Sequence, residues 1–194
     1  MNERIDRDNL VNILSIWNSH LGRKVHIIAC GGTALTLLNL KASTKDIDLV
    51  IPEEDEYRYL IDILKDLGYR KISGTGWAQD SGFRFDLFVG KSIFTTELLE
   101  SPIKEDNNMI FKELSSLYIG ILNYYDLIIS KLFRSYPVDI EDCLLLYQAK
   151  HMDIDIGRLK ERFYETSSYD VSDDKNKKNF VYFLSMLKKK GYKT

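Results

Sequence analysis

Apolar residues recur at helical spacing near the start of the chain, and shorter apolar runs follow them. The first set ends just before Gly22 and predicts an amphipathic helix. Its members are Leu10, Ile13, Leu14, Trp17 and Leu21. Up to about residue 122, runs of strand length then alternate with helical patterns. The predicted strands are 25–30, 47–51, 69–73, 83–89 and 117–122, the predicted helices between them are 33–40 and 53–67, and the predicted loop is 74–82. The stretch 91–116 carries no pattern that assigns it to either type.

After residue 122 the pattern changes to helical spacing alone. The predicted helices are 124–135, 139–150, 155–166 and 173–190, and the polar, serine-rich stretch 166–178 predicts a linker or loop. Asn123 and Asp139 are placed to cap the first two helices, each with an acidic residue three positions on. The chain is therefore predicted to be α+β. A mixed sheet flanked by helices fills residues 1–122, and a helical subdomain over 123–194 closes a cleft.

The composition is that of an ordinary globular protein, with 44% hydrophobic residues. Its 27 Lys+Arg and 29 Asp+Glu residues leave a formal charge of −2, which argues against binding to nucleic acid or membrane by bulk charge alone and leaves local basic patches such as 188–190 open. Cys30 and Cys143 form no CxxC pair and lie in apolar surroundings, which is typical of free thiols in a reducing compartment. The opening residues are charged, and no apolar run approaches the roughly 18 residues of a membrane span. We therefore expect a cytoplasmic protein with no membrane partner.

Carboxylates gather on one face of two predicted strands. Because side chains alternate along a strand, Asp46 and Asp48 point to one face while the apolar residues beside them point to the other. Asp86 stands in the same way among apolar neighbours on the strand 83–89. If the two strands are neighbours the three acids converge, and two like charges about 4 Å apart repel by roughly 4 kcal/mol at an effective dielectric of 20. Mg²⁺ offsets such repulsion, and two such ions can hold both partners of a phosphoryl displacement.

A glycine turn precedes these carboxylates in the chain. Gly31 and Gly32 let backbone N–H groups approach a phosphate, and Thr33 starts a predicted helix whose N-terminus favours an anion. Each feature also has an ordinary structural explanation. A Gly-Gly turn is usually only a turn, an Asp-x-Asp strand end is usually solvated, and Asp86 has Arg84 as a partner two residues away. The order in which the glycine pair, the Asp-x-Asp pair and the later Asp follow one another along the chain favours a combined metal and phosphate site.

The glycine pair Gly31-Gly32, the pair Asp46-x-Asp48 and the later Asp86 resemble the signature of the DNA polymerase beta-like nucleotidyltransferase superfamily. The resemblance covers most of the chain and implies a mixed-sheet nucleotidyltransferase fold followed by a helical subdomain. Within the superfamily, three segments resemble the AbiEii-like group and related small uncharacterised proteins. These segments are 44–49, 125–132 and 138–142.

The resemblance also implies roles for individual residues. The acids that bind metal and complete the catalytic site are Asp46, Asp48 and Asp86, and the residues that cradle the triphosphate are Gly31, Gly32 and Thr33. Many members of the superfamily have Gly-Ser where this chain has Gly-Gly-Thr, so the hydroxyl is displaced by one position.

Basic residues supply further candidates for binding the nucleotide. Lys131 shares a helix face with apolar residues, so it points inward or into a cleft. Either its stem covers apolar surface with the ammonium in water, or the ammonium reaches the phosphates. The Asp-Leu-x-x-x-Lys pattern of related proteins favours the second. Lys45 and Arg84 either contact phosphate or neutralise neighbouring acids, while Asp139 and Asp142 are interpreted as capping and salt-bridging residues.

Together these features predict a Mg²⁺-dependent nucleotidyltransferase. It would transfer a nucleoside monophosphate from a nucleoside triphosphate to a hydroxyl by a two-metal mechanism, releasing pyrophosphate. The acceptor is left open between a tRNA end, a protein side chain and a small hydroxylated molecule, and the AbiEii-like resemblance implies a toxin–antitoxin setting with a cognate protein partner. The alternative is a non-catalytic nucleotide- or protein-binding module, antitoxin-like, on the same fold.

Overall fold

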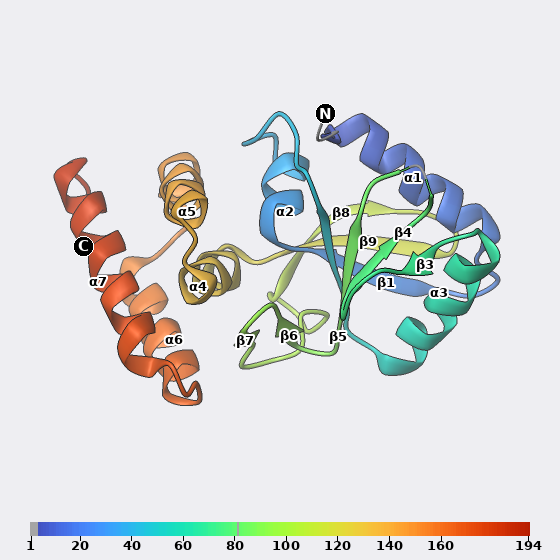
Figure 1. Cartoon of the computed structure of the whole chain (residues 1–194). Coiled ribbons are helices and arrows are strands. Elements are labelled where there is room, and N and C mark those ends of the chain that lie inside the picture. The colour runs from blue at the N-terminus through green and yellow to red at the C-terminus, as the bar shows by residue number, and fades with distance from the viewer. Residues whose placement is uncertain (1–3, 81) are drawn as a thin grey trace. The chain divides into compact units, whose positions relative to one another are not determined.

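The computed structural model describes residues 4–80 and 82–194 (Figure 1). Residues 1–3, the first part of the charged opening segment, and Ser81, in the predicted loop 74–82, lie outside the described residues. The chain forms two compact units. The first consists of Met1–Ser92 and Glu100–Leu122, and the second of Ile93–Leu99 and Asn123–Thr194. Among the described residues, no helix has the length and apolar character needed to span a membrane.

A seven-stranded mixed sheet forms the centre of the first unit, with the strand order β3-β4-β5-β2-β1-β9-β8. Its strands are β1 (Val25–Ala29), β2 (Ile47–Ile51), β3 (Arg70–Lys71), β4 (Gly76–Ala78), β5 (Phe85–Val89), β8 (Asn108–Glu113) and β9 (Leu117–Leu122). β2 runs parallel to β5 and β1 runs parallel to β9, while the other neighbours are antiparallel. The expected α+β class with a mixed sheet is confirmed. All five residues of β2 are buried, because this strand lies near the middle of the sheet.

Helices cover both faces of this sheet. α1 (Arg7–His20) and α3 (Glu54–Asp66) lie on one side of it, and α2 (Gly31–Leu37) lies on the other (Figure 1). Trp17 of α1 packs against Phe85 of β5 with ring centroids 4.6 Å apart, which places α1 on the apolar face of that strand. Because side chains alternate, Asp86 points to the opposite face. The acids therefore lie on the α2 face of the sheet.

The second unit is helical. Its helices are α4 (Tyr124–Arg134), α5 (Pro137–Lys150), α6 (Ile156–Ser168) and α7 (Asp173–Lys189). Their core is aromatic: Phe163 stacks on Phe180 at 4.0 Å between ring centroids, and Phe133 meets Phe163 edge-on. The strand β7 (Thr96–Glu97) also belongs to this unit and pairs with β6 (Ser92–Ile93).

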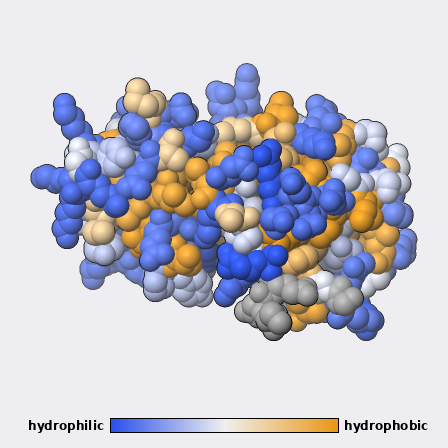
Figure 2. Space-filling model, turned by 90° about the horizontal axis from the view of Figure 1, so that it is seen from above, coloured by the Kyte–Doolittle hydropathy of each residue, from blue (hydrophilic) through white to orange (hydrophobic). Residues whose placement is uncertain are grey.

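Hydrophilic residues cover much of the face seen in Figure 2, interspersed with hydrophobic ones.

Several sequence-based expectations need correction. The predicted loop 74–82 contains strand β4, and the predicted strand 69–73 is paired only over Arg70–Lys71. The predicted linker 166–178 mostly belongs to α6 and α7, which leaves only residues 169–172 between them. Helix α2 begins at Gly31 and not at Thr33.

The capping predictions had opposite outcomes. Asn123 caps α4 as expected, because its side chain accepts a hydrogen bond from the backbone N–H of Asp126 at 2.9 Å. Asp139 is not the cap of α5. That helix begins at Pro137, which favours the first helical position, and Asp139 lies two residues inside it. From there its carboxylate accepts the backbone N–H of Tyr136 at 3.0 Å.

Candidate functional site

Strand register brings two of the predicted acids side by side. β2 and β5 are parallel neighbours, and Asp48 is the register partner of Asp86. Both residues are buried, with 5% and 7% of their surface exposed. Asp46 lies two residues before Asp48, just outside β2, and is exposed. The predicted neighbourhood of the two strands is therefore observed, and the carboxylates of Asp48 and Asp86 share one face.

The glycine turn lies directly against Asp48. Gly31 has a φ of +57°, and a Cβ atom built on it would lie 2.3 Å from Oδ2 of Asp48. A Cβ on Gly32 would lie 2.8 Å from Oγ1 of Thr44. Any side chain at Gly31 would therefore clash with the Asp48 carboxylate, and only glycine both adopts this backbone conformation easily and lets that carboxylate lie so close to the turn.

Thr33 fastens the turn to the acidic segment. Its hydroxyl accepts the backbone N–H of Asp48 at 2.8 Å and donates to the backbone carbonyl of Asp46 at 3.3 Å. Thr44 donates to the same carbonyl at 2.9 Å. The Thr33 side chain is fully buried, so its hydroxyl positions the Asp46–Asp48 segment. Its predicted contact with a triphosphate stays a prediction.

Arg84 is the cation of this site. Its Nη2 donates to Oδ1 of Asp86 at 2.8 Å and to Oγ of Ser73 at 3.2 Å. The hydrogen bond to Asp86 raises the pKa of Arg84, and the charges of Asp86, Asp46 and Asp48 act in the same direction. All three carboxylates thus lie close enough to act on one guanidinium. The predicted pairing of Asp86 with Arg84 is observed.

Thr75 is a member of this site that the sequence did not reveal. Its hydroxyl donates to Oδ1 of Asp86 at 2.8 Å, so that oxygen accepts from two side chains. Thr75 lies within the stretch predicted as a loop, and only the antiparallel pairing of β4 with β5 carries it beside Asp86. Local pattern contains no signal for such a contact.

The donor set is suited to a hard divalent cation. Carboxylate oxygens are the ligands that Mg²⁺ prefers, and Mg²⁺ is usually bound by one or two carboxylates together with water and substrate phosphates. Within residues 4–80 and 82–194, no group of three or more His, Cys, Asp or Glu side chains is arranged to hold a metal ion. The chemistry of Asp46 and Asp48 is what fits a cation, which would be shared between one or two carboxylates and a substrate.

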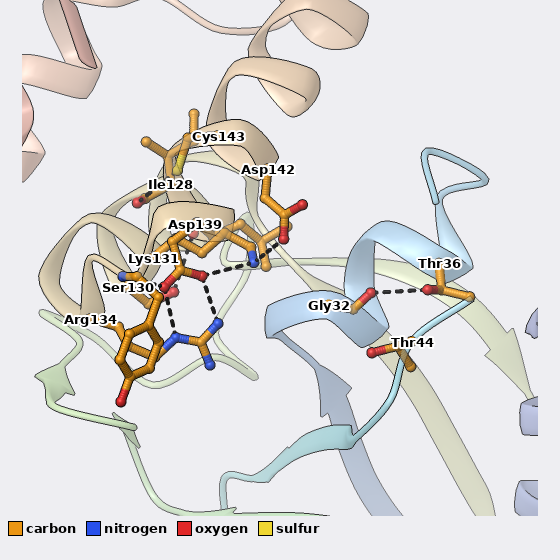
Figure 3. Close-up of polar contacts among 12 residues, drawn as sticks. Gly32, Thr36, Thr44, Ile128, Ser130, Lys131, Arg134, Asp139, Asp142 and Cys143 are labelled. Atoms are coloured by element: carbon orange, nitrogen blue, oxygen red, sulfur yellow. Dashed lines mark hydrogen bonds and ion pairs between the residues drawn. The ribbon is translucent and has the colours of Figure 1, made fainter. Parts of the chain in front are cut away.

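Lys131 belongs to an ion-pair network of the second unit (Figure 3). Its ammonium is buried and lies 2.8 Å from Oδ2 of Asp142 and 3.5 Å from Oδ1 of Asp139. Asp139 also binds Arg134, with 2.6 Å between Oδ1 and Nη2. The predicted salt-bridging role of the two acids is confirmed. The ammonium is not in water, so the simple picture of a solvated lysine end is wrong, and the predicted contact of Lys131 with phosphate stays a prediction.

Burial and charge act against each other in this network. Burial acts to raise the pKa of Asp139, but the Arg134 hydrogen bond and the charges of Arg134 and Lys131 outweigh it and hold that pKa below its usual value. Burial raises the pKa of the Cys143 thiol, whose Sγ lies 3.6 Å from the carbonyl oxygen of Ile128 (Figure 3). Lys45, the remaining predicted phosphate contact, is exposed beside Asp46 in the first unit.

Comparison with known proteins places this chain in a family. Residues 9–191 match the family described as nucleotidyltransferase of unknown function (DUF6036). The chain belongs to this DUF6036 family. No curated protein matches the chain. The AbiEii-like grouping finds no support in these matches, whereas the nucleotidyltransferase superfamily does.

Two solved structures of one protein resemble this DUF6036 chain. The solution structure of the antibiotic-resistance factor ANT(2'')-Ia is 15% identical, with a TM-score of 0.59 over 84% of this chain and 94% of that one. Its crystal structure in complex with adenylyl-2''-tobramycin is 16% identical, with a TM-score of 0.55 over 84% of this chain and 98% of that one. At this identity the likeness establishes the nucleotidyltransferase fold of the DUF6036 chain, and the activity must be argued from its own residues.

Proposed function

We propose that this DUF6036 protein transfers a nucleoside monophosphate from a Mg²⁺-bound nucleoside triphosphate to a hydroxyl acceptor. The observation that carries the proposal is the register pairing of Asp48 with Asp86, with the glycine turn at Gly31 packed directly against the Asp48 carboxylate. Arg84 offsets part of the repulsion between these two buried carboxylates, and buried charge clusters of this kind are concentrated at functional sites.

Each acid has a distinct role in this proposal. Asp46 and Asp48 would hold Mg²⁺, which would screen the charge of the triphosphate. Asp86 completes the site and faces the acceptor hydroxyl, where its carboxylate can accept the proton. Gly31, Gly32 and Thr33 approach the phosphates from the adjoining turn. Positioning and electrostatics would supply most of the rate.

The basic residues divide between two roles. Lys45, exposed next to Asp46, is proposed to contact the phosphates. The sequence suggested the same contact for Arg84, which pairs with Asp86, and for Lys131. The two carboxylate partners of Lys131 give it a structural role that does not depend on any ligand.

A small hydroxylated molecule is the acceptor class that we favour among those the sequence left open. The resembling protein ANT(2'')-Ia is described in complex with adenylyl-2''-tobramycin, in which a nucleotide group is attached to a small hydroxylated compound. A tRNA end or a protein side chain, a cognate partner and a toxin–antitoxin setting are further proposals from the sequence. A two-metal arrangement requires a second ion at Asp86. That ion would have to compete with Arg84, which already pairs with the Asp86 carboxylate.

Pyrophosphate release tests the proposal. The purified protein is incubated with Mg²⁺, each of the four common nucleoside triphosphates and three acceptor pools: polyhydroxylated small molecules, total tRNA and cell protein. We expect release with at least one combination, and its loss in Asp48→Asn. Asp62→Asn is the matched control, because Asp62 is an exposed carboxylate paired with Lys65 on α3. Equal release by the native chain and Asp48→Asn would refute the proposal.

Thermal stabilisation separates the enzyme from the non-catalytic alternative. Saturation with Mg²⁺ and nucleotide at about 100 times Kd should stabilise the native chain by about 2.7 kcal/mol. Asp48→Asn removes one of the crowded charges, so without ligand it should melt no earlier than the native chain, yet it should lose this stabilisation. Asp48-dependent nucleotide stabilisation without turnover in any pool would favour the binding module.

A further inference from the structure

A pocket that is open to solvent lies at the β3 edge of the sheet in the first unit, with a volume of about 690 Å³. Three of its lining residues are spaced four apart on α3 and therefore share one face of that helix: Tyr57, Ile61 and Lys65. The others come from the hairpin β3–β4 and the residue before it: Tyr69, Arg70, Lys71 and Trp77. Pockets of about 300–1,000 Å³ are the usual sites of small molecules in proteins.

This edge pocket lies on the opposite face of the sheet from the three acids. Trp77 is the register partner of Phe85, which packs against Trp17 of α1. Lys71 is in turn the register partner of Trp77. Register partners on neighbouring strands point to the same face, whereas Asp86, the residue after Phe85, points to the other. The edge pocket is therefore separate from the candidate site for nucleotidyl transfer.

The floor of the edge pocket is apolar and aromatic. It is formed by the buried residues Ile61, Tyr69 and Trp77, and Tyr57, which is half-buried, adds a third aromatic ring to the lining. The buried Nε1 of Trp77 has no hydrogen-bond partner among the described residues, which is uncommon for a buried donor. Aromatic side chains of this kind favour a flat ring as ligand, and the unpaired N–H adds positive partial charge to the floor.

The rim of the edge pocket is cationic. It consists of Lys65, Arg70 and Lys71, which are exposed, and none of the described lining residues is acidic. Lys65 pairs with Asp62. Arg70 pairs with Asp80, and exposed pairs of this kind are weak, so a bound anion can compete for both cations. Lys71 has no ion-pair partner within residues 4–80 and 82–194, so the rim keeps positive charge that an anion can offset.

We propose that the edge pocket binds a small aromatic anion, in which one ring system carries a phosphate or carboxylate group. The ring would lie on the floor, and the negative group would lie at the rim beside Arg70 and Lys71. Single-stranded nucleic acid also combines rings with negative charge, but it requires a groove that follows several nucleotides, whereas this pocket has the volume of a single small ligand. The proposal does not depend on the proposed nucleotidyl transfer.

Binding of 1-naphthyl phosphate tests the proposal. The compound is titrated into the full chain at low salt and without divalent cations, and its Kd is measured by isothermal titration calorimetry. We expect it to bind at least about tenfold more tightly than 1-naphthol, which lacks the charge, and than inorganic phosphate, which lacks the ring. Equal affinity for the three compounds, or no binding of 1-naphthyl phosphate at millimolar concentration, would overturn the proposal.

Substitutions at the rim locate the bound anion. The double variant Arg70→Met/Lys71→Met should weaken binding about tenfold, whereas Lys71→Arg keeps the charge and should bind as the native chain does. Lys178→Met is the matched control, because Lys178 is an exposed lysine of α7 in the second unit, and its Kd should be unchanged. Melting curves show whether each variant is folded. Lys71→Met alone, with an expected loss of about threefold to fivefold, serves if the double variant is not folded.

The remaining outcomes separate this inference from its alternatives. Unchanged binding by the folded rim variants would overturn the proposal. Asp48→Asn should bind 1-naphthyl phosphate as the native chain does, and loss of binding in that variant would assign the compound to the acidic site instead. An oligothymidylate that binds more tightly than 1-naphthyl phosphate, and that loses affinity in the rim variants, would assign the pocket to single-stranded nucleic acid and contradict the proposal.

Discussion

Replacing Gly31 with alanine tests the close approach between the glycine turn and Asp48. Gly31 combines a φ of +57° with a built Cβ position 2.3 Å from Oδ2 of Asp48. Gly68 has a similar backbone conformation, with a φ of +85°, but no atom lies within 4 Å of its built Cβ. Gly68→Ala is therefore a matched control that carries the backbone strain without the contact.

The two substitutions should differ by the energy of the contact. A non-glycine residue in the left-handed region costs about 1–2 kcal/mol, which applies to both variants. Overpacking a rigid site costs about 1–3 kcal/mol more, and only Gly31→Ala carries this term because buried Asp48 has little room to move. The entropy that alanine removes from the unfolded chain is the same in both and cancels. We expect a loss of about 2–5 kcal/mol for Gly31→Ala and about 1–2 kcal/mol for Gly68→Ala.

Urea unfolding followed by tryptophan fluorescence measures this loss in the right part of the molecule, because Trp17 and Trp77 are the two tryptophans of the chain and both belong to the first unit. A double-mutant cycle with Asp48→Ala isolates the contact. Asp48→Ala should recover about 1–3 kcal/mol in the Gly31→Ala background relative to its effect in the native chain. Equal losses for Gly31→Ala and Gly68→Ala, or a coupling energy near zero, would refute the reasoning.

The helical unit yields three further predictions. Lys131→Met leaves the buried carboxylates of Asp139 and Asp142 without their ammonium partner, and it should destabilise the second unit by about 3–5 kcal/mol. Urea unfolding followed by tyrosine fluorescence measures the change, and a loss below about 1 kcal/mol would contradict the assigned ion pairs. Because the pKa of Asp139 is lowered in the folded state, its contribution to stability is present above about pH 4 and is lost as the pH falls through the folded-state pKa. Asp139→Asn should therefore weaken the fall in the free energy of unfolding at acid pH, and an unchanged fall would contradict the lowered pKa. Since both thiols are buried and burial raises the pKa of Cys143, a thiol reagent at pH 8 should modify Cys143 and Cys30 only after urea is added, and rapid labelling of the folded protein would argue against this packing.

Elements with a strong local pattern could be predicted from the sequence. The bounds of β2 and β9 are those predicted, because each is a short apolar run that lies buried inside the sheet. In the hairpin β3–β4, the strand 69–73 was predicted too long and β4 was not predicted. The strands of this hairpin have two and three residues, both residues of β3 are exposed, and β4 begins with a glycine. They are strands because β4 pairs with β5 and β3 pairs with β4.

The candidate site divides in a similar way. The three acids Asp46, Asp48 and Asp86 could be identified from the sequence, because acidic residues within apolar strands are uncommon outside functional sites. Their surroundings did not: whether Asp86 faces Asp48 depends on strand order, and the donors to its Oδ1 include Thr75 from a segment with no local pattern. A salt-bridging role of Asp139 and Asp142 was expected, but the burial of Lys131 against them depends on how α4 and α5 pack.

The division of the chain has a practical consequence for anyone who wishes to express its parts. Because Ile93–Leu99 belongs with the helices, the polypeptide passes from one unit to the other three times. A single cut after Leu122 would therefore yield an N-terminal fragment carrying a strand that belongs elsewhere and a C-terminal fragment deprived of it. Clean separation requires a short linker in place of residues 93–99 in the first piece, and the same seven residues fused ahead of Asn123 in the second.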